Sequence, residues 1–136
     1  MEREELGALF GRITRRLIAA ERPVLTGHNL SMWEYAVLAD LAERPADTQL
    51  ALAKAIGYDK SRLIPMLDEL EQAGLIGREP DPADRRARIV RLTPAGQQRL
   101  ADARADVTAM ENEFLSPLTA DEQRALFRIL PKLAED

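Results

Sequence analysis

The segment at residues 81–96, DPADRRARIVRLTPAG, constrains the fold of this chain more than any other. It reads as a charged loop, a strand and a helix start, because Thr93 followed by Pro94 is an N-cap with proline at the first helical position. Four arginines crowd onto it in a chain of formal net charge −4: Arg85, Arg86, Arg88 and Arg91. A folded core does not require that density of guanidinium groups. The segment therefore predicts a projecting hairpin that presents positive charge to an anionic partner.

The composition limits how such a partner could be bound. At 136 residues the chain is one domain, or one domain with helical arms, and it is long enough to bury a core. A hydrophobic content of 46% with 31% charged residues excludes a disordered chain. The negative net charge argues against nonspecific coating of nucleic acid, which strongly basic proteins carry out. Any contact with nucleic acid must therefore rest on a local basic patch.

Several classes of function are excluded by residue types that are missing or rare. The chain has no cysteine, which removes disulfides, thiolate zinc sites and thiol redox sensing, and its only histidine is His28. No convergent catalytic group and no metal or cofactor site is predicted. No apolar run is long enough to span a bilayer, and the acidic N-terminal segment is unlike a signal peptide. We expect a cytoplasmic protein that does not bind membranes.

Periodicity and capping residues predict a mainly α-helical fold. Helices are expected at residues 2–22, 31–44, 49–56, 60–73, 94–114 and 120–133. Ser31 with Glu34, and Thr119 with Glu122, form the capping-box pattern, and Asp47 or Thr48 should cap the third helix. Gly57 occupies the position that a left-handed C-cap prefers.

Four residues carry more specific expectations about these helices. Pro23 should close the first helix, Pro65 should bend the fourth or remove one of its hydrogen bonds, and Pro131 should interrupt the last. Trp33 should lie on the buried face of the second helix with Val37, Leu38 and Leu41.

Two short strands complete the predicted fold. They cover residues 75–79 and 87–93, and Pro80 and Pro82 should stiffen the loop tip between them. Two helices joined by a short turn at Gly57 and followed by a hairpin describe a winged helix–turn–helix. We therefore expect a winged DNA-binding domain at residues 30–93. Dimerisation helices should flank it at residues 1–29 and 94–136.

The second helix of such a motif enters the major groove with its N-terminal side chains on the base edges. Lys60 suits a phosphate, Arg62 suits bidentate bonds to guanine, and Ser61 suits either partner. Taken alone, Lys60 and Arg62 are better interpreted as a solvated helix face, as most such charges are. Together with the wing they predict a DNA contact surface, whose candidate residues are Lys60, Ser61, Arg62, Pro65, Arg85, Arg86 and Arg88.

The wing arginines have a predicted role of their own. Arg85 and Arg86, at the tip of the hairpin, could reach a minor groove, where narrow A·T stretches concentrate negative potential. Asp84 beside them should orient one arginine through its carboxylate. One of the two arginines would then be held internally, and the other would be free to contact DNA.

The sequence resembles MarR-type transcriptional regulators over nearly its whole length. The similar blocks lie at residues 30–41, 52–57, 70–78 and 84–96. The last block, Asp-Arg-Arg-x-x-x-Val-x-Leu-Thr-x-x-Gly, is the specific one, whereas the others occur in many winged-helix proteins. The resemblance implies a homodimer whose first, fifth and sixth helices intertwine. The family's wing arginine matches Arg86.

The resemblance also implies what such a dimer does. These regulators usually repress transcription at short pseudo-palindromes, and many release double-stranded DNA when a small aromatic or phenolic effector binds. In the family the effector pocket lies where the dimer helices meet the winged domain. The matching candidates here are Arg16, His28, Trp33 and Tyr35, with Arg16 able to meet an anionic group.

Alternatives remain at this point. The apolar stripes of the first, fifth and sixth helices could form an ordinary bundle within one chain, although a two-fold dimer would also explain palindromic recognition. A winged helix can serve as a protein–protein interaction module without operator binding, because a fold alone does not fix function. An enzyme is the least supported class, since only carboxylates, hydroxyls and lysine could act.

Overall fold

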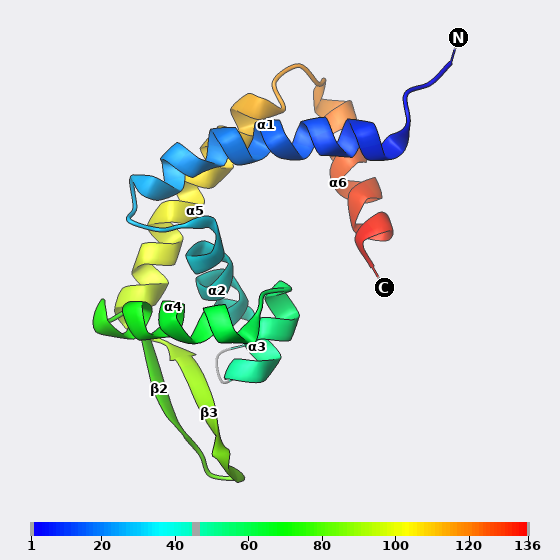
Figure 1. The fold of residues 1–136 in the computed structure, drawn as a ribbon. Helices are drawn as coiled ribbons and strands as arrows, with labels where there is room; N and C mark the ends of the chain where they lie inside the picture. The colour runs from blue at the N-terminus through cyan, green and yellow to red at the C-terminus, as the bar shows by residue number, and fades with distance from the viewer. Residues whose placement is uncertain (1, 45–46, 136) are drawn as a thin grey trace.

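The computed structural model describes residues 2–44 and 47–135. Its helices are α1 (Leu6–Thr26), α2 (Met32–Glu43), α3 (Gln49–Ile56), α4 (Lys60–Gln72), α5 (Pro94–Phe114) and α6 (Ala120–Ala134). Its strands are β1 (Asp47–Thr48), β2 (Ile76–Asp81) and β3 (Asp84–Leu92). The β2–β3 hairpin projects from one end of the molecule, and α1 and α6 lie at the other (Figure 1). The predicted mainly helical fold with a small wing is confirmed.

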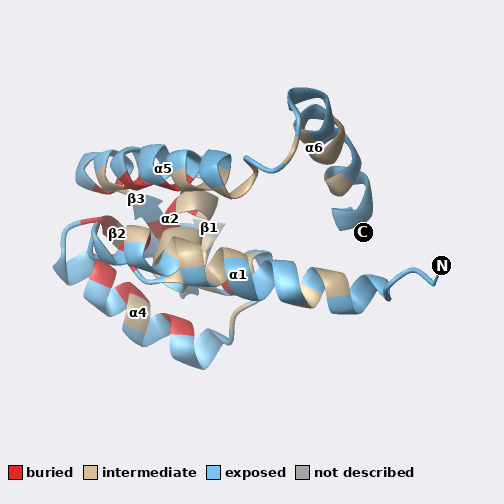
Figure 2. Cartoon of the chain, turned by 90° about the horizontal axis from the view of Figure 1, so that it is seen from above, coloured by how far each residue is buried: buried red, intermediate tan, exposed pale blue. Residues whose placement is uncertain are grey.

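The core of the winged domain lies where α2, α3, α4, α5 and the base of the sheet meet. Leucines three and four residues apart on α4 point into it, which leaves the opposite face of α4 exposed. Buried positions gather on α2, α4 and α5 in Figure 2, and α6 has none. The residues with almost no exposed surface are Leu25, Val37, Leu38, Leu41, Leu52, Leu63, Leu67, Leu70 and Val90.

Trp33 does not share this burial, contrary to the expectation. Its side chain is 40% exposed, whereas Val37, Leu38 and Leu41 on the same helix are fully buried. Trp33 lies in the first turn of α2, before the helix enters the core, and its ring stacks on Tyr58 instead.

The sheet has three antiparallel strands in the order β1-β3-β2. The sequence did not predict β1, because two residues are too few to show an alternating pattern; Thr48 pairs with Ile89 of β3. Both wing strands are longer than predicted, since pairing continues from Ile76 with Leu92 out to Asp81 with Asp84. The expected charged loop is thus reduced to a two-residue tip, and Arg85 and Arg86 lie on a strand.

The predicted caps are present. The side chains of Ser31 and Thr119 form capping boxes, and Thr48 and Thr93 accept hydrogen bonds from the first turns of α3 and α5. Gly57, with φ of 69°, ends α3 in the left-handed conformation and begins the turn into α4.

The prolines do not break their helices, contrary to two of the expectations. Pro23 lies inside α1, which continues to Thr26, and Pro131 lies inside α6, which continues to Ala134. Pro65 is likewise inside an uninterrupted α4. Each proline removes one helical hydrogen bond, but each is exposed, as is the residue four positions before it. At exposed positions water is available to the freed carbonyl groups, which is in line with helices that continue past the prolines.

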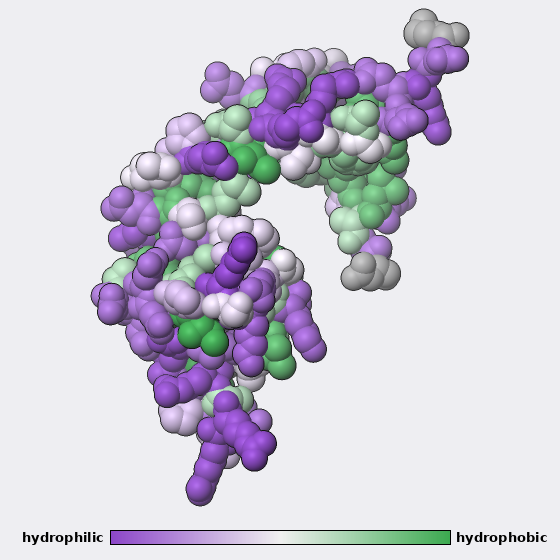
Figure 3. All heavy atoms as spheres, viewed as in Figure 1, coloured by the Kyte–Doolittle hydropathy of each residue, from purple (hydrophilic) through white to green (hydrophobic). Residues whose placement is uncertain are grey.

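Helix α6 packs only loosely on the rest of the chain. None of its residues is buried, and it stands apart from the winged domain when the molecule is seen from above (Figure 2). Large apolar side chains remain exposed on it, and hydrophobic atoms gather over this helix in Figure 3. In the part of the chain that the structure describes, no helix is long and apolar enough to cross a membrane.

Candidate nucleic-acid interface

The start of α4 presents polar side chains to solvent. Leu63 and Leu67 anchor the helix in the core, and Lys60, Ser61 and Arg62 are exposed on its first turn. The Ser61 hydroxyl donates a 2.5 Å hydrogen bond to Oδ2 of Asp59, the N-cap residue, and this bond lowers the pKa of the Asp59 carboxyl. Ser61 thus has its proton engaged within the protein, so its oxygen is left to accept a hydrogen bond from a ligand.

The wing separates its arginines onto two faces. Successive side chains of a strand point to opposite sides, so Arg86 and Arg88 share the face of the buried Val90. Arg85 and Arg91 belong to the other face. Arg91 is engaged there, because its Nε lies 2.6 Å from Oε1 of Glu79 on β2.

One cavity of about 310 Å³ joins the wing to the start of α4, and Lys60, Arg86 and Arg88 line it together with Asp81 and Asp84. Asp84 does not orient an arginine side chain as expected. Its Oδ1 accepts a 3.0 Å hydrogen bond from the backbone N–H of Arg86, and Oδ1 of Asp81 accepts one from Ala83. Both carboxylates therefore shape the backbone of the tip, and the guanidinium group of Arg86 is left unengaged.

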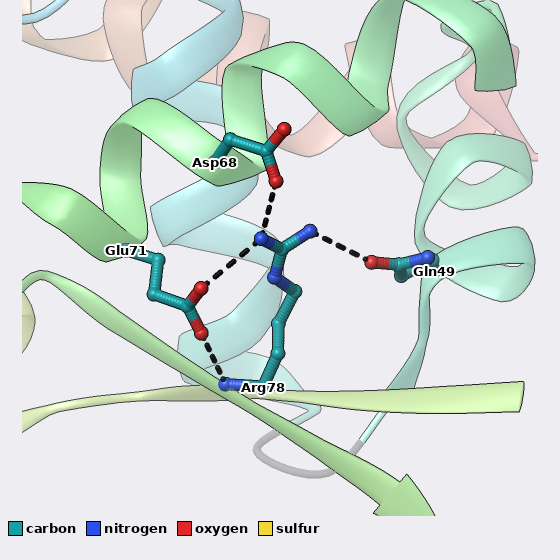
Figure 4. A network of polar contacts seen from close by, with 4 residues as sticks. All are labelled: Gln49, Asp68, Glu71 and Arg78. Atoms are coloured by element: carbon teal, nitrogen blue, oxygen red, sulfur yellow. Dashed lines mark hydrogen bonds and ion pairs between the residues drawn. The ribbon is translucent and has the colours of Figure 1, made fainter.

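The residue that holds the wing against α4 is Arg78, a role that was not predicted (Figure 4). Its Nη2 donates to Asp68 and, at 3.1 Å, to Glu71, and its Nη1 donates to Gln49 of α3 at 3.2 Å. The backbone N–H of Arg78 also donates to Glu71. These bonds lower the pKa of the Glu71 carboxyl. Arg78 thereby offsets part of the negative charge at the end of α4 and ties β2 to that helix.

The start of α5 is joined to the same region. The Thr93 hydroxyl donates a 2.6 Å hydrogen bond to the Gly74 carbonyl and accepts one from the Gly96 N–H. Gly74 follows the last turn of α4, so one threonine ties the end of α4 to the beginning of α5. This link fixes the winged domain on the helix that leads to the other end of the molecule.

The four candidate effector residues do not line one cavity. Arg16 lies over the ring of Phe114 at 5.4 Å, and Nε2 of His28 lies 2.7 Å from Oδ2 of Asp106. Tyr35 packs against the core. Trp33 lines a cavity of about 460 Å³ between α1 and α2.

That cavity contains a cation that the sequence analysis missed. Arg22 lines it with Trp33, and the other lining residues are Ile18, Leu25, Thr26, Leu30, Ser31 and Met32. Helical spacing could have predicted Arg22, because residues 18, 22, 25 and 26 share one face of α1, whereas residue 16 lies on another face. Among the described residues, no group of His, Asp or Glu is arranged to hold a metal ion.

The positive side chains of α4 and the wing therefore fall into two sets. Arg78 and Arg91 are ion-paired. The cations at the start of α4 and along the wing form no ion pair with any described residue: Lys60, Arg62, Arg85, Arg86 and Arg88. A helix–turn–helix followed by a hairpin wing, with unpaired cations on both, is typical of the winged helix–turn–helix class of DNA-binding proteins.

Comparison with known proteins identifies the family. The profile of the MarR family matches residues 30–87. The transcriptional regulator HosA of Escherichia coli O111:H- is 37% identical over 105 residues, which cover 77% of this chain and 78% of HosA. The chain therefore belongs to the MarR family and is a DNA-binding transcriptional regulator.

Solved structures agree with this assignment. The apo form of wild-type MarR from E. coli superposes with a TM-score of 0.90 at 26% identity, over 99% of this chain and 100% of MarR. The repressor CouR, solved bound to a 23-mer DNA duplex, superposes with a TM-score of 0.85 at 28% identity. The match covers 99% of this chain and 100% of CouR. PcaV of Streptomyces coelicolor, solved with its natural ligand, superposes with a TM-score of 0.75 at 28% identity. The match covers 98% of this chain and 97% of PcaV. These relatives do not favour a winged helix used only for protein contacts.

Proposed function

We propose that this regulator is a homodimeric repressor whose α4 and wing read a pseudo-palindromic operator. The observation that carries the proposal is the set of cations without ion-pair partners, on the start of α4 and on the wing. Lys60, Ser61, Arg62 and Pro65 would enter the major groove, since all four are exposed on α4. Arg85, Arg86 and Arg88 would contact the flanking backbone and minor groove.

The charge distribution supports specific binding over general adhesion. The chain carries a net charge of −4, yet the projecting part of the wing is strongly hydrophilic (Figure 3). Its strand β3 carries three arginines without ion-pair partners in the described part of the chain, Arg85, Arg86 and Arg88. Binding that releases counterions from phosphates weakens steeply as salt rises. If about 6–10 phosphates are contacted, affinity should fall roughly 10³–10⁵-fold between 50 and 200 mM salt.

A second copy of the chain would cover the exposed apolar surface of α1 and α6. Leu6, Phe10, Phe127 and Leu133 are large apolar residues that the single chain leaves exposed. A further apolar cavity of about 190 Å³ lies between α1, α5 and α6, so these helices are not closely packed in one chain. A two-fold dimer would place two copies of α4 about one helical turn of DNA apart, roughly 34 Å.

The cavity between α1 and α2 is where we propose that an effector binds. Arg22 supplies a positive charge that no described residue pairs, and Trp33 supplies an aromatic surface. This pairing suits a small aromatic carboxylate, whose anion would meet Arg22 while its ring packs against apolar side chains. Because the proposed partner is operator DNA, we also propose that the protein acts in the cytoplasm.

Selection of bound duplexes from a random library tests the proposal. The consensus of the bound duplexes should contain two related half-sites in inverted orientation. Fluorescence anisotropy should then show much tighter binding to the selected duplex than to a scrambled duplex of equal composition. Enrichment of no consensus, with equal binding to both duplexes, would overturn it. Sedimentation velocity of the same protein checks the dimer.

A further inference from the structure

Trp33 and Tyr58 form the only stacked ring pair among the described residues, and they join two parts of the molecule with different proposed roles. Their ring centroids are 4.5 Å apart and the ring planes are inclined by 25°. Trp33 lines the cavity between α1 and α2. Tyr58 lies in the turn between α3 and α4, immediately before Asp59, the N-cap of α4. The pair therefore connects the wall of the cavity to the turn that precedes α4, the proposed recognition helix.

The backbone around Tyr58 is held firmly, so a displaced ring would act on the turn itself. The Tyr58 N–H donates to the Ala53 carbonyl at 2.9 Å, and Gly57 has the left-handed φ of 69° that the turn requires. Only Asp59 separates Tyr58 from Lys60, the first residue of α4. A shift of the turn thus moves Lys60, Ser61 and Arg62 relative to the DNA.

Trp33, in contrast, has room to move. Its side chain is 40% exposed and lies outside the set of fully buried residues that fix the rest of α2. A ligand in the cavity would contact the indole ring directly, because that ring is part of the cavity wall. The free energy of an aromatic pair corresponds to about a 2- to 12-fold change in an equilibrium constant.

We propose that the Trp33–Tyr58 stack couples the cavity between α1 and α2 to the start of the recognition helix. In the structure the stack supports the turn before α4, and a ligand that displaces Trp33 withdraws that support and weakens DNA binding. This inference rests on the proposed function, since it requires both the DNA surface and the cavity. Coupling between two binding equilibria is reciprocal, so DNA binding must in turn alter the surroundings of Trp33.

The reciprocal effect is measurable because Trp33 is the only tryptophan of the chain. Tryptophan emission and the anisotropy of a labelled duplex would be recorded in the same titration, first with the selected operator duplex and then with the scrambled duplex as control. Saturation with this duplex should change the emission of Trp33, whereas the scrambled duplex should not at equal concentration. The change should persist in Tyr58→Phe, which keeps the ring, and disappear in Tyr58→Ala.

Affinity gives a second readout in the same samples. Tyr58→Ala should weaken binding to the operator duplex about 2- to 12-fold, whereas Tyr58→Phe should bind as the parent does. Operator binding with unchanged Trp33 emission in the parent would overturn the coupling and leave the proposed function standing. An emission change that survives in Tyr58→Ala would also overturn it, because the stack would then not carry the signal. Absence of specific binding in the anisotropy channel would overturn the proposed function, and the coupling with it.

Discussion

Gly96 packs so closely against Leu75 that no other residue fits at its position. A Cβ built on Gly96 would lie 2.0 Å from the Leu75 carbonyl oxygen and 2.8 Å from Cδ1 of Leu92. The first turn of α5 thereby rests directly on the backbone that connects α4 to β2. This contact sets the angle between the long helix α5 and the DNA-reading elements.

Gly96→Ala should therefore destabilise the protein and weaken operator binding together. Overpacking of this kind costs about 1–3 kcal/mol, since the obstructing atom is backbone. Chemical denaturation and anisotropy would measure the two effects. The matched control is Gly77→Ala on β2, where an added Cβ meets nothing within 4 Å. Equal stability of the two variants would contradict the close contact.

The Arg78 network predicts a stability that depends on pH. Arg78→Gln removes the cation shared by Asp68 and Glu71, and it should lower the free energy of unfolding near neutral pH. Because Arg78 lowers the pKa of Glu71, this stabilisation is complete above the ordinary value of 4.5 and is lost as pH falls through the lowered pKa. Unfolding curves should be recorded at neutral pH and below pH 4.5. The difference in free energy of unfolding between parent and variant should be smaller in acid. A gap that is constant with pH would argue against the Glu71 contribution.

The raised pKa of Glu21 on α1 predicts a stability that changes with pH in the opposite direction. Partial burial, and then the nearby carboxylate of Glu111 on α5, raise the pKa of Glu21 above 4.5. The folded state thus holds the proton more tightly, and stability falls as pH rises through the window from 4.5 to the raised pKa. Glu21→Gln should be more stable than the parent at pH 7 and should show no gain below pH 4.5. Identical pH profiles for the two proteins would refute the shift.

Substitution of Phe127 tests whether a second chain covers α6. It is 61% exposed in the single chain, so its replacement by glutamate should leave the fold of one chain intact. In a dimer the same change would bury a charge, which is strongly unfavourable. Sedimentation velocity should therefore show Phe127→Glu as a monomer with weakened operator binding, and Phe127→Leu as a dimer. A dimer of unchanged stability for Phe127→Glu would place the interface elsewhere.

The sequence predicted features that are determined locally. The capping boxes at Ser31 and Thr119 and the left-handed Gly57 each depend on neighbouring residues, and all were confirmed. The wing was predicted for the same reason, since Thr93 and Pro94 mark its end.

Features that depend on distant partners were missed. Strand β1 exists only because β3 pairs with it, and Arg78 gains its role from Asp68 and Glu71 on another element. The prolines were misjudged because their effect depends on whether the freed carbonyl group meets solvent. The side chains of Arg85, Arg86 and Arg91 were alike in sequence, and only the register of β3 with β2 distinguishes them.

The central claim is that the cations of α4 and the wing that form no ion pair with a described residue, and not positive charge in general, bind DNA. Arg86→Gln and Arg91→Gln remove the same charge from the same strand, but Arg91 is paired with Glu79 at 2.6 Å and Arg86 has no ion-pair partner among the described residues. The most direct measurement is the salt dependence of operator binding for both variants by anisotropy. Arg86→Gln should weaken binding and reduce the salt slope by about one, whereas Arg91→Gln should keep the slope of the parent. Equal loss of affinity and slope in the two variants would contradict the claim.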